Sequence, residues 1–219
     1  IEKMYRDRME YILNHGNDFE NLIGRYDSPQ GRMSFIEDVA EYLSNKFGWK
    51  IGPENVGITN GSQSAFFYLF NLFSGTFSKE GKKKTIVLPL VPEYIGYADQ
   101  GLEPDAFVGI PATFTMFDNH TFKYNINFEL LEDYLENHHN VGALCVSRPT
   151  NPTGNVLTNN EIHKLSDLAK KYDIPLMVDN AYGLPWPDII FDDNAIPYWD
   201  ENVILSMSLS KIGLPSLRT

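Results

Sequence analysis

Five short polar clusters in the chain each come directly after a segment of apolar residues that is typical of a strand. These clusters are residues 60–63 (NGSQ), 92–94 (PEY), 148–154 (RPTNPTG), 179–182 (DNAY) and 208–211 (SLSK). They include an amine in Lys211, a carboxylate in Asp179 and an aromatic ring in Tyr94. A lysine amine near a sheet's interior can act as a nucleophile, and a poorly solvated carboxylate requires a partner. The clusters therefore indicate chemistry on a ligand that offers a carbonyl group and a protonatable atom.

Each cluster taken alone also has an ordinary structural explanation. A lone lysine after a strand is usually a solvated surface residue, and Asp179 could cap a helix or close a local turn. Gly61 and Ser62 bring backbone N–H groups to a helix start, where an anion is favoured, although Ser62 or Asn60 could simply cap that helix. Taken together, the groups match one ligand, an aldehyde on a protonatable ring that carries a phosphate. They predict a site for pyridoxal 5′-phosphate.

The segments that position these clusters alternate between strands and amphipathic helices. Helices are predicted over residues 34–47, 62–73, 128–137 and 158–172, from apolar residues at helical spacing. Strands are predicted over residues 56–59, 85–90, 141–147, 174–179 and 203–208. Thr158 and Glu161 form a capping-box pattern, and Gly48 is placed to end the first helix. This alternation predicts a three-layer α/β domain, a largely parallel sheet with helices on both faces, in which ligands bind at the carboxyl ends of the strands.

The clusters, in their order and spacing, resemble those of class I and II aminotransferases, which are pyridoxal-phosphate enzymes of fold type I. The resemblance covers essentially the whole chain and rests on the five clusters together. Within the family, the segments ITNGSQSAFFYLFNLF, PLVPEYIGYAD, CVSRPTNPTGN and SLSKIGLP are most similar to the branch that exchanges amino groups between valine and pyruvate. The resemblance implies the large, cofactor-binding domain of that fold.

The resemblance also implies a role for each matching residue, with Lys211, Asp179 and Tyr182 as the catalytic set. Lys211 would hold the cofactor as an internal aldimine and, once displaced by substrate, carry the proton between the substrate Cα and the cofactor carbon. Asp179 would pair with the ring nitrogen, and Tyr94 would stack on the ring. The cofactor's oxygens would be bound by Asn151 and Tyr182 at the phenolate, and by Gly61, Ser62, Gln63, Ser208 and Arg218 at the phosphate. Two departures weaken the match at Arg218, which follows Lys211 by seven residues where the family usually has eight, with Ser216 in place of a usual glycine.

The resemblance implies a domain organisation that extends beyond this chain. We expect residues 1–50 to be an N-terminal segment of the family's small domain with its connecting helix, and residues 51–219 to be a truncated large domain. The C-terminal small domain, which holds the arginine for the substrate carboxylate, lies outside the sequence, so we expect a fragment that is inactive alone. Tyr26 matches the tyrosine that reaches the phosphate of a neighbouring subunit, which implies a homodimer.

The expected activity is transamination between a small aliphatic amino acid, valine or alanine, and a 2-oxo acid such as pyruvate. Another activity of fold type I, such as a C–S β-lyase, would use the same residues and stays an alternative. A non-catalytic aminotransferase-like module is a third reading, although such regulators carry a DNA-binding domain before the fold. Arg148 lies outside the common family pattern, and we expect it to have a structural role.

Composition argues against several other classes of protein. The chain has 29 acidic and 18 basic residues and a formal charge of −11, so no nucleic-acid surface is expected. No segment approaches the roughly 18 consecutive apolar residues that a membrane span requires. The single cysteine, Cys145, lies in an apolar run and permits no internal disulfide, which fits a reducing cytoplasm. The five histidines have no companions at metal-ligand spacing, so no metal site is expected.

Overall fold

The computed structural model describes residues 1–77, 81–190, 192, 194–213 and 215–217 of the chain. These residues belong to two compact units, Ile1–Thr59 and Asn60–Thr219. The first unit contains α1 (Glu2–Asn14), α2 (Asp18–Gly24), α3 (Met33–Phe47) and the 3₁₀ turn η1 (Pro53–Asn55). The helix predicted over residues 34–47 is confirmed as α3, and Gly48 ends it in a left-handed conformation with φ of 71°. No helix in the described part of the chain is long and apolar enough to cross a membrane.

The strand predicted over residues 56–59 is wrong. The backbone N–H of Ile58 donates to the carbonyl oxygen of Gln30 at 2.8 Å. The side chain of Gln30 in turn donates to the carbonyl oxygens of Pro53 and Val56. This one glutamine therefore binds backbone groups that a neighbouring strand would otherwise bind. The polar cluster at residues 60–63 follows a loop, although the helix predicted after it is present.

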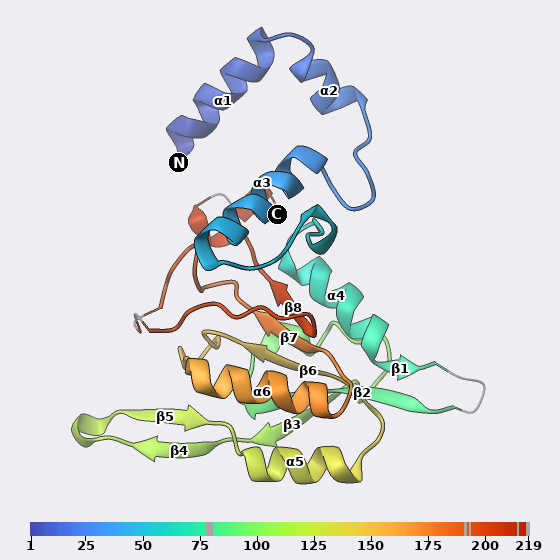
Figure 1. Cartoon of the computed structure of the whole chain (residues 1–219), viewed down its shortest axis with the longest axis vertical. Coiled ribbons are helices and arrows are strands. Elements are labelled where there is room, and N and C mark those ends of the chain that lie inside the picture. Colours follow the sequence, from blue (N-terminus) through green and yellow to red (C-terminus); the bar gives the residue numbers. More distant parts are fainter. Residues whose placement is uncertain (78–80, 191, 193, 214, 218–219) are drawn as a thin grey trace. The chain divides into compact units, whose positions relative to one another are not determined.

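The second unit is built on a mainly parallel sheet (Figure 1). Its strands are β1 (Gly75–Thr76), β2 (Lys83–Val91), β3 (Phe107–Pro111), β6 (Val141–Ser147), β7 (Leu176–Asp179) and β8 (Val203–Ser206). They lie in the order β1-β2-β6-β7-β8, β3 also pairs with β2, and only the β1–β2 pair among these described strands is antiparallel. The helices of this unit are α4 (Ser62–Phe73), α5 (Phe128–Asn137) and α6 (Asn159–Lys171). The other four predicted strands and the remaining predicted helices are therefore confirmed, with ends that differ by a few residues.

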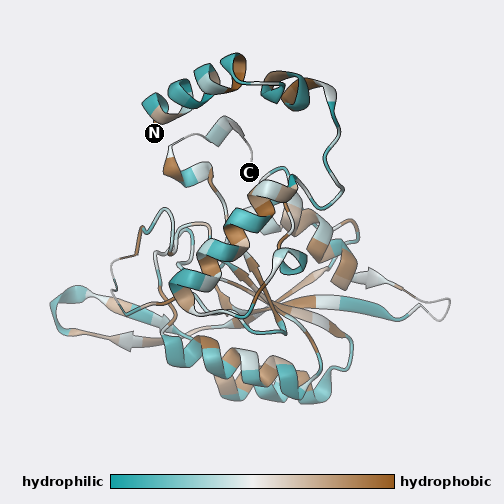
Figure 2. Ribbon diagram, turned by 45° about the horizontal axis from the view of Figure 1, so that its top comes forward, coloured by the Kyte–Doolittle hydropathy of each residue, from teal (hydrophilic) through white to brown (hydrophobic). Residues whose placement is uncertain are grey.

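The sheet is covered on both faces, and successive residues of each strand contribute to opposite cores. On one face, residues such as Leu144 pack against α5 and α6. On the other face, Cys145 and Met177 pack with Phe66 and Phe70 of α4. Figure 2 shows the apolar strands in brown between helices whose surfaces are mixed. Helices on both faces of a mainly parallel sheet confirm the predicted three-layer α/β fold, and Cys145 is the buried core residue that was expected.

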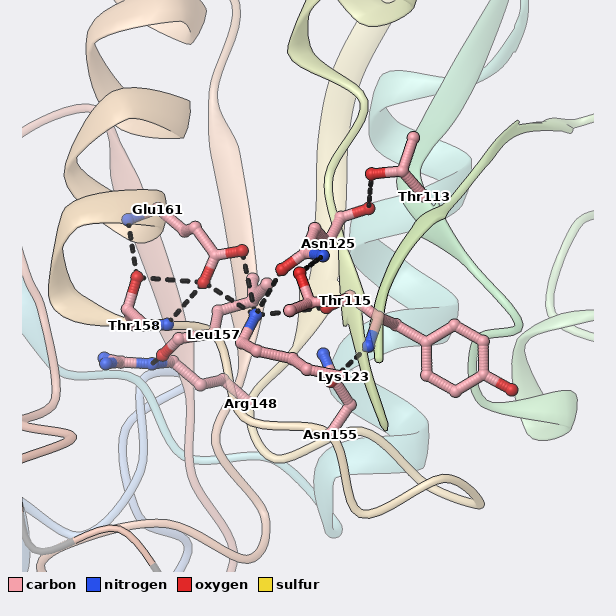
Figure 3. Close-up of polar contacts among 10 residues, drawn as sticks. Thr113, Thr115, Lys123, Asn125, Arg148, Asn155, Leu157, Thr158 and Glu161 are labelled. Carbon is pink, nitrogen blue, oxygen red and sulfur yellow. Dashed lines mark hydrogen bonds and ion pairs between the residues drawn. The ribbon is translucent and has the colours of Figure 1, made fainter. Parts of the chain in front are cut away.

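A hairpin that the sequence pattern did not indicate lies between β3 and α5. Its strands are β4 (Thr113–Met116) and β5 (Phe122–Asn125), and most of its side chains are exposed or half-buried. Lys123 connects the hairpin to α6, because its Nζ lies 2.9 Å from Glu161 Oε1 (Figure 3). Glu161 also completes the predicted capping box with Thr158 at the start of α6. A partly buried ion pair therefore anchors the hairpin to the helix layer.

Gly142 in β6 determines how closely the end of α4 approaches the sheet. A Cβ atom at this position would lie 1.7 Å from the carbonyl oxygen of Phe73, the last residue of α4. We expect Gly142→Ala to lower the free energy of unfolding by about 3 kcal/mol, because a backbone atom must move to make room. Gly57→Ala is the control, since a Cβ there would meet no atom within 4 Å. Equal denaturation midpoints for the two variants would contradict this explanation of Gly142.

Candidate active site

The first polar cluster lies at the start of helix α4. Gly61 precedes the helix with φ of 84°, a left-handed conformation that favours glycine. The N-cap position is thus held by a residue without a side chain, and not by Asn60 or Ser62. Ser62 and Gln63 form the first turn and are half-buried. Backbone N–H groups of a first turn have no acceptor within the helix, and the helix dipole favours an anion beside them.

Asp179 ends β7 and is 8% exposed. Its Oδ2 accepts a hydrogen bond from the Tyr97 hydroxyl at 2.9 Å, and its Oδ1 accepts one from the backbone N–H of Ala181 at 3.0 Å. Burial raises the pKa of this carboxyl, whereas the two hydrogen bonds and the charge of Lys211 lower it. The bond to Ala181 is the local turn contact that the sequence allowed. The bond to Tyr97 shows that Asp179 also belongs to a longer-range polar network.

Tyr97 connects Asp179 to the aromatic residues around it. The ring centroid of Tyr97 lies 5.2 Å from that of Phe66 in α4 and 5.4 Å from that of Tyr94. Burial raises the pKa of the Tyr97 hydroxyl well above its usual value, so the group stays protonated and donates to Asp179. One tyrosine therefore holds α4, Tyr94 and Asp179 together. Tyr97 was not among the predicted site residues, although it stands only three positions after Tyr94.

Lys211 lies in the short 3₁₀ turn η4 (Ser210–Ile212) beyond β8. Its Nζ is 5.3 Å from the centroid of the Tyr182 ring, and its charge acts on Asp179. The side chain is exposed, and not enclosed near the sheet interior as the sequence pattern suggested. The physical reason is that β8 already ends at Ser206, so the lysine is carried on a turn outside the sheet. The structure nevertheless brings Lys211, Tyr182 and Asp179 to one edge of the sheet.

The remaining residues predicted for the site lie at several places. Ser208 is buried after β8, and its hydroxyl accepts a hydrogen bond from the backbone N–H of Ser210 at 3.1 Å. Asn151 is half-buried in the turn after β6. Tyr26 belongs to the first unit and is fully exposed. Arg218 lies outside the described residues.

Glu93 is a second acid at this edge of the sheet. Its Oε2 accepts the backbone N–H of Ser147 at 2.9 Å, and its Oε1 accepts the Ser147 hydroxyl through a short hydrogen bond. Oε1 also accepts the backbone N–H of Tyr94 at 2.9 Å. Burial raises the pKa of Glu93 from 4.5 to about 7, against the effect of these three donors. Glu93 stands in a cluster identified from the sequence, but its partner Ser147 is 54 positions away and no local pattern reveals it.

The raised pKa of Glu93 predicts how stability depends on pH. The folded chain keeps this proton up to about pH 7, whereas the unfolded chain releases it near pH 4.5. The folded state therefore binds more protons in this window, and its stability must fall as pH rises. We expect the wild-type protein to lose roughly 2–3 kcal/mol relative to Glu93→Gln between pH 4 and pH 8. Urea unfolding at the two pH values measures this difference, and a pH-independent difference would contradict it.

The guanidinium group of Arg148 donates its hydrogen bonds to other groups of the protein. It is 3% exposed, and its Nε donates to the carbonyl oxygen of Leu157 at 2.7 Å. Its two terminal nitrogens donate to the carbonyl oxygen of Ile196 at 2.6 Å and to Asn159 Oδ1 at 2.8 Å. Burial lowers the pKa of Arg148 to about 10, so it stays charged at neutral pH. These contacts agree with the structural role expected for Arg148, which fastens the loop that carries Asn151.

Known proteins resemble this chain in both sequence and structure. The family described as aminotransferase class I and II matches residues 20–218. The valine–pyruvate aminotransferase of Escherichia coli (strain K12) is 51% identical over 218 residues, which cover 100% of this chain and 51% of that relative. The crystal structure of valine-pyruvate aminotransferase from Salmonella typhimurium LT2 superposes with a TM-score of 0.82 at 44% identity, covering 98% of this chain and 51% of that one. Alanine aminotransferase 2 of Xenopus laevis is 28% identical over 163 residues, 73% of this chain and 29% of that relative.

Proposed function

Because the chain belongs to the class I and II aminotransferase family, we propose that it is the cofactor-binding part of an enzyme that transfers amino groups with pyridoxal 5′-phosphate. The main support is that Asp179, the ring of Tyr94 and the amine of Lys211 lie at the same edge of the sheet. Tyr97 contacts both Asp179 and Tyr94, and the charge of Lys211 acts on Asp179. A buried anion, an aromatic ring and an amine suit a pyridine aldehyde. The chain spans about half the length of the curated relatives it matches. The complete reaction is therefore proposed for a polypeptide that also carries the second half.

The described residues fit this cofactor. Asp179 is a buried carboxylate that accepts hydrogen bonds from Tyr97 and Ala181 but forms no ion pair within the described part of the chain, so it suits a cationic ring nitrogen. Tyr94 would lie against the ring. We assign the phenolate oxygen to Asn151 and Tyr182, and the phosphate to Gly61, Ser62, Gln63, Ser208 and Arg218. The assignment to α4 is supported by the start of this helix, which no side chain caps and where the helix dipole favours an anion.

Each catalytic residue then has a defined task. Pyridoxal phosphate supplies an aldehyde that takes up an amino group and a ring that accepts the electron pair left at the substrate Cα. Asp179, held by Tyr97, would keep the ring nitrogen protonated, because a buried anion stabilises positive charge beside it. Lys211 would hold the cofactor through Nζ, and its amine would carry the proton that leaves the substrate Cα. Tyr182, whose ring centroid lies 5.3 Å from Lys211 Nζ, would donate to the phenolate oxygen.

We propose valine or alanine and pyruvate as the amino-acid and 2-oxo-acid substrates. The support is that relatives at 51% and 44% identity are both named valine–pyruvate aminotransferases. A C–S β-lyase would use the same cofactor residues, but these names favour transamination. A non-catalytic module is disfavoured as well, because both of these relatives are named as aminotransferases.

We further propose a homodimer, in which Tyr26 reaches the phosphate of the neighbouring subunit, and a cytoplasmic location. Full exposure of Tyr26 is compatible with a contact to another subunit, and the single cysteine is compatible with a reducing compartment. In this proposal residues 1–50 belong to the small domain and residues 51–219 to the large domain. The arginine that binds the substrate carboxylate would come from the second half of the polypeptide.

The proposed reaction is tested with the full-length polypeptide, pyridoxal phosphate, valine and pyruvate. Alanine and the 2-oxo acid of valine should form in equal amounts, because the amino group leaves one skeleton and enters the other. A C–S β-lyase would instead release ammonia and pyruvate from cystathionine. Cofactor binding without alanine formation would exclude this transaminase activity while leaving the cofactor site in place.

A further inference from the structure

Glu93 is an acid of the site that the proposed reaction does not use. Its two carboxylate oxygens accept three hydrogen bonds, two from Ser147 and one from the backbone N–H of Tyr94. Three donors to one carboxylate favour its ionised form, although its surroundings exclude much of the solvent. Glu93 is ionised only above about pH 7, and a carboxylate that is ionised in such a place suggests a positively charged neighbour that is bound when the enzyme works.

The position of Glu93 follows from the way β2 and β6 separate. The two strands are paired only as far as Val87 and Leu144, so β2 offers no acceptor at the end of β6. Glu93 supplies that acceptor to the backbone N–H of Ser147. The same carboxylate holds the backbone N–H of Tyr94. One side chain therefore joins the end of β6 to the loop that carries the proposed ring-stacking tyrosine.

Ser147 places this acid one strand away from Asp179. Ser147 and Asp179 are register partners in β6 and β7. Among the described residues that face Glu93, Asp179 is the other acid, while burial keeps Tyr97 and Cys145 protonated at neutral pH. Burial is the main cause that raises the pKa of Glu93, and the charge of Asp179 raises it further. A pair of acids coupled in this way gains stability from a cation placed between or beside them.

We propose that Glu93 is a positioning residue of the cofactor site, a second anion that acts with Asp179 to hold a proton on the ring nitrogen of bound pyridoxal phosphate. This inference rests on the proposed function. The charge of Glu93 adds negative potential near the ring, and its hydrogen bonds fix Ser147 and the Tyr94 loop on either side. Glu93 ionises near neutral pH in the free protein, so its full effect is present above about pH 8.

The test compares wild-type and Glu93→Gln forms of the full-length enzyme loaded with pyridoxal phosphate. The absorbance of the bound cofactor is followed as pH is varied. We expect the midpoint of its pH-dependent change to fall by about half a unit to one unit in the variant, because a nearby negative charge stabilises the protonated form. We also expect kcat above pH 8 to fall about tenfold while KM changes less than about threefold, since the charge acts on the reacting ring and not on substrate binding.

Two further variants keep the test decisive. Glu103→Gln is the matched control, because Glu103 is an acid of the same unit whose carboxylate binds Thr76 at the surface, and it should leave the midpoint and kcat unchanged. Glu93→Asp retains the charge and should bring the midpoint back toward the wild-type value. If Glu93→Gln folds poorly, the Glu93→Asp midpoint still tests whether the charge matters.

The results distinguish a failure of the role proposed for Glu93 from a failure of the proposed function. A Glu93→Gln midpoint equal to that of the wild type, or a Glu93→Asp midpoint displaced as far as that of Glu93→Gln, would overturn the role of Glu93 and leave the proposed function intact. A wild-type enzyme that binds no pyridoxal phosphate would overturn the proposed function as well.

Discussion

Replacing Lys211 with alanine is expected to abolish covalent attachment of pyridoxal phosphate and to lower the transaminase rate of the full-length enzyme by about 10⁴-fold or more. The charge of the Lys211 amine acts on Asp179. The Nζ atom of Lys211 lies 5.3 Å from the centroid of the Tyr182 ring. The substitution therefore removes both the nucleophile for the aldehyde and the base for the Cα proton. Cofactor absorbance and a coupled assay for alanine measure the two effects.

Attachment can also be read directly from the mass of the protein. Treatment with borohydride should fix the cofactor on the peptide that contains Lys211, and the alanine variant should show no added mass there. Lys164→Ala is the control, because Lys164 is an exposed lysine of the same unit whose Nζ lies over the Phe128 ring. A Lys211→Ala protein that still carries the cofactor covalently would sink the assignment.

Replacing Asp179 with asparagine is expected to lower kcat by about 10²–10³-fold, the usual effect of removing one preorganised charge from an active site. Asparagine retains one oxygen that can accept the Tyr97 hydroxyl, so the size and shape of the side chain are preserved. Its amide nitrogen cannot accept the backbone N–H of Ala181, so the charge and one local hydrogen bond are lost. The ring nitrogen then loses the anion that keeps it protonated. Steady-state kinetics and the cofactor spectrum both report this loss.

The same substitution should not weaken the fold. Burial raises the pKa of Asp179, so its ionised form is less stable in the folded chain than in water. We expect the free energy of unfolding of apo Asp179→Asn at pH 8 to equal or exceed that of the wild type. Asp200→Asn, which loses a surface contact to Lys170, should leave kcat unchanged. A rate loss in Asp179→Asn that tracks a loss of stability would point to misfolding and away from a lost charge.

Strands whose side chains are buried were easier to predict from the sequence than strands whose side chains are exposed. Residues 141–147 were predictable as a strand because every one of them is buried, with Leu144 and Cys145 facing different cores. Strand β4 was not, because all four of its side chains are exposed and give no buried face to recognise. Residues 56–59 have the composition of a strand, but Gln30 binds their backbone from a loop.

Local patterns predicted single residues of the site better than the contacts between them. Asp179 and Lys211 follow recognisable strands, and their types indicate their chemistry. The hydrogen bond from Tyr97 to Asp179 joins residues 82 positions apart, and that from Ser147 to Glu93 spans 54 positions. Both contacts depend on β6 lying between β2 and β7, which is a property of the strand order and not of any segment.

That strand order has a further consequence for how the molecule reaches its working state. The groups assigned to the cofactor come from the start of α4 and from the ends of β2, β6, β7 and β8, so their cradle is complete only after distant segments have paired in parallel. Pairings of this kind are slow, because long loops must close before any contact is gained. A ligand that binds only the finished cradle stabilises it by mass action, by about 2.7 kcal/mol at a hundred times its Kd. The cellular supply of cofactor would then govern how many molecules remain folded, in addition to how fast each one turns over.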